Sequence, residues 1–148
     1  MKKFTILLFA LAAVLCAPVH AQYSAPIREI GGGTLNIAAT STNTTMAATN
    51  LAAIEATRAL DIAVQPQFRL TGSGTSAVVL NFDTSLDNSH WTLATHSITV
   101  TANGTNTVSK VSNFTLGAIG YLRLSQVENP NASAITNLTI RYAQKRVQ

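Results

Sequence analysis

Apolar residues alternate with polar ones along most of the C-terminal two thirds of the chain. In residues 59–70, Ile62, Val64 and Phe68 fall on every second position, and Pro66 interrupts the run. Six further segments show the same alternation or a looser form of it: 34–40, 76–85, 95–104, 105–117, 118–129 and 134–144. Several short strands at regular spacing predict an all-β fold, an antiparallel β-sandwich or jelly roll.

Residues 50–60 fit two kinds of secondary structure. Leu51 and Ile54, with Glu55 and Arg58 three positions apart, suit a short helix. The surrounding alanines and threonines suit a strand nearly as well. Both alternatives stay open at the level of sequence.

The segment before the first strong strand pattern is poor in large apolar groups. Residues 22–50 contain Pro26, three consecutive glycines at 31–33 and a run of Thr, Asn and Ala. We therefore expect a flexible N-terminal arm over 22–50, in which only 34–40 is suited to a strand, on a sheet edge. The β-sandwich domain is expected to span 51–148.

The first residues have the pattern of a secretory signal peptide. Two lysines precede an apolar run over 4–17, which is too short to cross a bilayer, and small residues lead up to Ala21. We expect a signal peptide over 1–21 with cleavage after Ala21. The single cysteine, Cys16, lies inside that segment, so the exported chain is expected to use neither disulfide nor thiolate chemistry. Secretion to the periplasm or the extracellular space follows as an expectation.

Charge is scarce in this sequence. The formal net charge is +4, and removal of the two N-terminal lysines lowers it to +2. Apart from Lys145 and Arg146, the basic residues are scattered, so nucleic acid is not expected as a partner. Beyond the signal peptide we expect no association with a membrane.

Candidate catalytic and metal-binding groups are sparse. His90 and His96 lie close in sequence, but the pattern supplies no third or fourth metal ligand beside them. The nucleophile motif G-x-S-x-G and phosphate-binding loops are absent from the sequence, and the acidic residues are dispersed. We expect no enzyme activity, no metal and no cofactor.

One short motif carries a family resemblance. The stretch "SLDNSHW" at 85–91 places Ser85, Asp87, Asn88 and Trp91 between two strand patterns. It resembles the S-x-D-G-x-x-W hairpin of discoidin-type, galactose-binding-like β-sandwich domains, with asparagine in place of glycine. Both residues tolerate positive φ. The resemblance implies a structural turn in which the aspartate accepts backbone N–H bonds and the tryptophan packs on the sandwich.

The resemblance extends over residues 59–143. The segment "GYLRL" at 120–124 is similar to a strand that follows the tryptophan in that family, and "ITNLTIRYA" at 135–143 is similar to its last strand. The same order is similar to small β-sandwich proteins of phage particles and to secreted bacterial proteins.

Two functions are consistent with these features. The first is an exported, non-enzymatic structural or assembly protein of a virion, filament or cell surface. Such a protein would associate with itself or with other particle proteins through its N-terminal arm. The alternative is a carbohydrate-binding or adhesive module, in which Trp91, His90 and Tyr142 are the candidate glycan contacts.

Overall fold

The computed structural model describes residues 28–43, 53–57, 59–117 and 119–146. These residues form ten β-strands and no helix, which confirms the predicted all-β antiparallel fold. The strands are β1 Arg28–Ile37, β2 Ser41–Asn43, β3 Ile54–Glu55, β4 Ala59–Leu70, β5 Ala77–Ser85, β6 Trp91–Thr101, β7 Val108–Ser109, β8 Ser112–Thr115, β9 Tyr121–Asn129 and β10 Ile135–Arg146.

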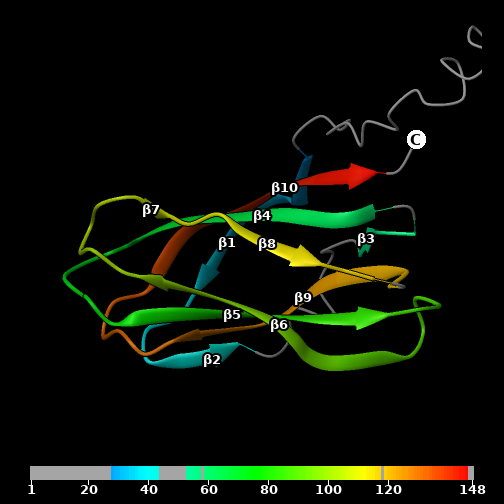
Figure 1. Cartoon of the computed structure of the whole chain (residues 1–148). Coiled ribbons are helices and arrows are strands. Elements are labelled where there is room, and N and C mark those ends of the chain that lie inside the picture. Colours follow the sequence, from blue (N-terminus) through cyan, green and yellow to red (C-terminus); the bar gives the residue numbers. More distant parts are fainter. Residues whose placement is uncertain (1–27, 44–52, 58, 118, 147–148) are drawn as a thin grey trace, which may run out of the picture.

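The strands form two layers, here called sheet A and sheet B (Figure 1). Sheet A has the order β1-β10-β4-β7, and β8 pairs with another part of the same edge of β4. Sheet B has the order β2-β9-β5-β6, and β3 also pairs with β9. This interleaved order is that of a jelly roll, because strands that follow one another in sequence repeatedly lie in opposite sheets.

Alternating apolar side chains from both sheets meet between the layers. Ile62 and Val64 of β4 face Leu80 and Phe82 of β5 across this core, and all four are fully buried. Phe82 contacts Phe114 of β8 edge to face, with ring centroids 5.5 Å apart. This contact joins the two sheets at their β6 and β8 side.

Two buried asparagines hold the loops at one end of the sandwich. The Asn129 amide donates to the carbonyls of Ala38 and Ser133, at 2.9 and 3.0 Å. Asn131 binds both backbone groups of Ser76, accepting from its N–H at 2.9 Å and donating to its carbonyl at 3.2 Å. Because buried loop backbone needs partners, these amides replace the ladder bonds that are missing there.

The structure corrects the expected extent of the N-terminal arm. Residues 28–43 supply β1, which pairs with β10, and β2, which pairs with β9. Ile37 is buried opposite Ile135, so the apolar pattern of 34–40 forms an edge strand within its own sandwich. Of the rest of the expected arm, residues 22–27 and 44–50 lie outside the described residues. The expected signal peptide over 1–21 and its cleavage site also lie outside them.

The ambiguity at 50–60 resolves to strand for the residues described there. Ile54 and Glu55 form β3, with Ile54 opposite Leu122 of β9. Ile54 is buried at the edge of the core. Tertiary pairing thus overrides the local helix preference of the Glu55 and Arg58 spacing.

Candidate functional site

The β5–β6 hairpin ends in a tightly hydrogen-bonded turn. The Ser85 hydroxyl accepts the N–H of Asn88 at 3.0 Å and donates to Asp87 Oδ1 at 3.0 Å. The same Asp87 oxygen accepts the N–H groups of Ser89 and His90 at 2.9 and 2.8 Å. Asn88 has a φ of 62°, a conformation that asparagine tolerates better than most residues.

Asp87 and His90 also interact through their side chains. His90 Nδ1 lies 2.6 Å from Asp87 Oδ2, and both groups are solvent-exposed. The hydrogen bond from the His90 N–H is the largest cause that holds the pKa of Asp87 far below its usual range. The side-chain hydrogen bond to Asp87 raises the pKa of His90. Both shifts favour the charged pair, so the turn is best held between about pH 4 and pH 6.5, the ordinary pKa values of the two groups.

Gly120, directly before β9, supports the hairpin. Its N–H donates to the Ser85 carbonyl at 3.0 Å. A Cβ at this position would lie 2.6 Å from the backbone oxygen of Leu86. Only glycine allows this approach, so the "GYLRL" segment and the hairpin are built to fit each other.

Beside the turn, a buried carboxylate organises an arginine and the tryptophan. Asp83 is 1% exposed, and its Oδ2 accepts from the Arg123 guanidinium at 3.2 Å. Its Oδ1 accepts the N–H of Ala94 at 2.9 Å, where β6 bulges and Ala94 has a φ of 49°. The Arg123 guanidinium lies 4.0 Å from the centroid of the Trp91 ring. Asp83 therefore fixes Arg123, and Arg123 fixes Trp91 by a cation–π contact.

Trp91 lies on the outer face of sheet B. Its neighbours in register are Ser85 on β5 and then Tyr121 on β9. Trp91 and Tyr121 are both partly exposed, on strands separated by roughly 10 Å. Trp91 and Arg123 occupy the face of the sheet opposite the core, so the tryptophan packs against the outside of the sandwich.

A row of amides and carboxylates continues along the same face. The Asn81 amide donates to Glu128 Oε1 at 3.0 Å and to Gln126 Oε1 at 3.4 Å. We use the name sheet B face for the outward side chains of this region: Asn81, Asp83, Trp91, Tyr121, Arg123, Gln126 and Glu128. The sheet B face thus combines aromatic rings with hydrogen-bonding groups whose orientations are already set.

The three sequence-predicted contact residues are not brought together. Trp91 and His90 share the hairpin, and the His90 side chain is 91% exposed. Tyr142 lies on β10 in the other sheet, where it is partly buried against the core. A single ligand site that includes all three residues is therefore excluded by the fold.

His96 is directed inward rather than to a site. His96 is on β6, opposite Phe82 of β5, and its ring stacks on Phe114 with centroids 4.6 Å apart. Its Nε2 is buried and has no hydrogen-bond partner among the described residues. Burial lowers the pKa of His96, which favours the neutral form of the ring at the edge of the core.

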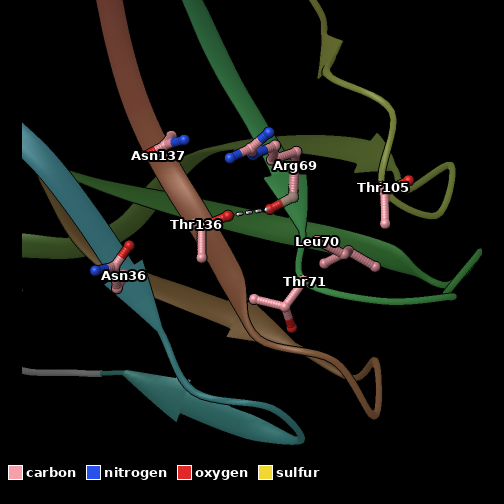
Figure 2. A pocket seen from close by; sticks show the side chains of 7 residues that line it. All are labelled: Asn36, Arg69, Leu70, Thr71, Thr105, Thr136 and Asn137. Carbon is pink, nitrogen blue, oxygen red and sulfur yellow. Dashed lines mark hydrogen bonds between the residues drawn. The ribbon is translucent and has the colours of Figure 1, made fainter.

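A polar groove opens on the outer face of sheet A, with a volume of about 510 Å³. We call it the Arg69 groove, and its lining comes from β1, β4, β10 and the loops after β4 and β6: Asn36, Arg69, Leu70, Thr71, Thr105, Thr136 and Asn137. Figure 2 shows Arg69 between the side chains of β1 and β10 and, on the other side, Thr105. The Thr136 hydroxyl donates to the backbone carbonyl of Arg69 at 3.4 Å. This hydrogen bond does not involve the Arg69 guanidinium.

A β-bulge in β10 creates this groove. Ile135 and Leu138 both point into the core although they are three positions apart. The extra residue leaves Thr136 and Asn137 on the outer side, and Asn137 has a φ of 55°. Bulges often re-aim side chains beside functional sites. The interrupted alternation between Ile135 and Leu138 was the sequence signal for it.

Sequence reasoning missed the residues that surround both regions. Asp83 and Arg123 carry no motif, because each has its partner on another strand, and Arg69 lies in a groove whose lining comes from several strands. Asp83 and Arg123 are 40 positions apart in sequence, and only strand register places them together.

The part of the chain described by the structure contains no group of three metal-ligating side chains. Within the same residues, no helix has the length and apolar character needed to span a bilayer.

No protein-family model and no curated protein matches the chain. Solved structures with a similar overall arrangement include the PBSX exported protein XepA, with a TM-score of 0.48 and 16% identity. The match covers 88% of this chain and 40% of XepA, so the chain spans less than half the length of that protein. A protein of Bacillus endospore appendages, described as disulfide-linked pili, has a TM-score of 0.37 and 15% identity, with 90% and 96% covered.

A carbohydrate-binding module of family CBM4 has a TM-score of 0.44 and 14% identity, with 82% of this chain and 78% of that chain covered. At these scores the likeness gives no information on ligand or partner. The chain is defined by its own structure as a jelly-roll β-sandwich, with one aromatic polar surface on sheet B and one polar groove on sheet A.

Proposed function

We propose that this protein is an exported, non-enzymatic carbohydrate-binding or adhesive module, and that its ligand lies on the sheet B face. The observation that carries the proposal is the position of Trp91. Its side chain is partly exposed, and the Arg123 guanidinium lies 4.0 Å from the centroid of its ring and holds it in place. A fixed aromatic ring offers an apolar platform to the C–H face of a sugar. Arg123 covers one side of the indole, so the sugar is expected at the other side or along the ring edge.

The hydrogen-bonding side chains beside Trp91 support the same proposal. Asn81 of β5 donates to both Gln126 and Glu128 of β9, and Asp83 holds Arg123. Sugars are recognised by planar amide and carboxylate groups as well as by rings. Because these groups are already ordered by one another, less conformational entropy is lost when a ligand binds.

Replacing Trp91 with alanine is expected to weaken glycan binding at least about tenfold, since the platform is removed. A glycan array of neutral oligosaccharides, followed by calorimetry on any hit, measures this loss. Val111→Ala is the matched control, because Val111 is an exposed apolar residue outside the sheet B face, and it should bind as the wild type does. Retention of the hit by Trp91→Ala, with an unchanged fold, would remove the basis of the proposal.

A structural or assembly role is the second candidate, and a specific observation favours it. Leu86 and Leu93, on the β5–β6 hairpin, are 74% and 72% exposed. Two exposed leucines on one hairpin suit burial against another protein. Assembly through the N-terminal arm is less well supported, because the strand-forming residues Leu35 and Ile37 already pair with β10 of the same chain.

The long edge strand β6 is also protected against pairing with another sheet. Its bulge at Ala94 interrupts the edge, and the Lys110 ammonium donates to the Thr99 carbonyl at 3.0 Å. Lysines and bulges are common means of blocking edge-to-edge association.

Light scattering on the wild type and on a Leu86→Ser/Leu93→Ser variant separates the two candidates. Concentration-dependent oligomers that this variant loses would favour assembly, and a monomer in both would favour the binding module.

A further inference from the structure

We propose that the Arg69 groove is a second binding site, selective for saccharides that carry a carboxylate or sulfate group. It lies on sheet A, on the side of the sandwich away from the sheet B face, and it is independent of the site proposed above.

Arg69 provides an anion-binding group that no acidic residue occupies. Its side chain is exposed in the groove, and no carboxylate of the described residues lies within ion-pair distance of its guanidinium. A guanidinium presents a planar fork of donors that matches carboxylate and sulfate oxygens in pairs.

The rest of the lining suits the hydroxyl groups of a sugar. Asn36, Asn137 and three threonines surround Arg69, and each offers a donor or an acceptor. The residues that line the groove include no aromatic side chain on which a nucleic-acid base could stack. These two features favour an acidic saccharide over a nucleic acid as the source of the anion.

The wider face of sheet A carries charged residues of both signs. Arg141 and Lys145 of β10 lie on the same outward side as Arg69, according to the alternation of buried positions. Asp61, opposite Lys145, is the acidic residue that the described part of β4 contributes to this side. Glu29 of β1 lies opposite Arg141 in register, so the wider face has charges of both signs, and the proposal rests on Arg69 and the lining of the groove.

The backbone of the groove is shaped by a conformation that is unusual for a non-glycine residue. Asn137 has a φ of 55° and lies in the bulge that displays Thr136 and Asn137 beside Arg69. A straight β10 would send one of these side chains into the core. The bulge is therefore what converts a flat sheet surface into a groove.

Calorimetric titration of the full chain with three oligosaccharides of equal length tests this proposal. The three are a uronic acid oligomer, a sulfated oligomer and a neutral oligomer. The wild type is expected to bind at least one acidic oligomer through the groove, and Arg69→Gln is expected to weaken that binding about tenfold or more. Arg69→Lys, which keeps the charge but loses the planar fork, is expected to give an intermediate affinity. Whether the uronic or the sulfated oligomer binds identifies which anion the groove accepts.

Arg141→Gln is the matched control, because it removes one positive charge from the same face without touching the groove. It is expected to change the affinity less than twofold. Equal losses in Arg69→Gln and Arg141→Gln would overturn the proposal in favour of a diffuse field, and so would the absence of binding by both acidic oligomers. Trp91→Ala should leave the acidic oligomer bound. The test of the Arg69 groove can therefore fail without affecting the proposed glycan site at Trp91, and the reverse is also true.

Discussion

Replacing Phe82 with alanine is expected to lower the free energy of unfolding by about 3–5 kcal/mol. Phe82 is fully buried on β5, and its ring meets Phe114 of the opposite sheet. Truncation removes the transfer free energy of the ring and leaves a cavity between strands that are held by their own ladders. Urea denaturation measures the change from the shift in midpoint at constant slope.

Phe82→Leu is the control for this prediction. It keeps most of the volume and should cost less than about 1.5 kcal/mol. A loss below about 1 kcal/mol in Phe82→Ala would show that the contact between the sheets at Phe82 and Phe114 contributes little to the fold. A loss of the expected size is a large share of the roughly 5–15 kcal/mol typical of a domain.

Replacing Asp83 with alanine is expected to cost about 3 kcal/mol of unfolding free energy. This is the lower end of the range for breaking a buried ion pair, because the Arg123 side chain is 20% exposed and water reaches part of it. The substitution also leaves the Ala94 N–H in the β6 bulge without its acceptor. The melting curve and the urea midpoint report the loss.

Two further variants separate the causes. Asp83→Asn keeps an oxygen for the Ala94 N–H and removes the charge. Its free energy of unfolding should therefore lie between that of the wild type and that of Asp83→Ala. In the double variant Asp83→Ala/Arg123→Ala, no unpaired guanidinium remains, and part of the stability should return. Strictly additive losses would show that Asp83 and Arg123 do not act as a pair.

The alternation of apolar residues was sufficient to predict the class of fold and most of the strands after residue 59. Leu122 and Leu124 of β9 are buried as their spacing requires, and so are Ile62 and Val64 of β4. The error at the N-terminus has a physical cause. The glycines at 31–33 give this part of β1 no side chains to signal a strand, whereas β1 pairs with β10 on both sides of them, at 28–30 and at Leu35 and Ile37.

The site was less accessible to sequence reasoning because it depends on register. The motif at 85–91 located the turn residues, but it could not show on which face of the sheet Trp91 lies. That face is determined by Arg123, which comes from β9, and by Asp83, which comes from β5. The Arg69 groove depends in the same way on a bulge in β10, where one added residue changes the face of the side chains that follow.

The emission of Trp91 gives the most direct test of the central claim, that the sheet B face binds carbohydrate. Trp91 is the single tryptophan of the chain, so its fluorescence reports on this surface alone. Titration with a neutral oligosaccharide retained on the array is expected to shift the emission in a saturable way, with the same dissociation constant as calorimetry. Binding by calorimetry with unchanged Trp91 emission would place the ligand elsewhere and contradict the claim.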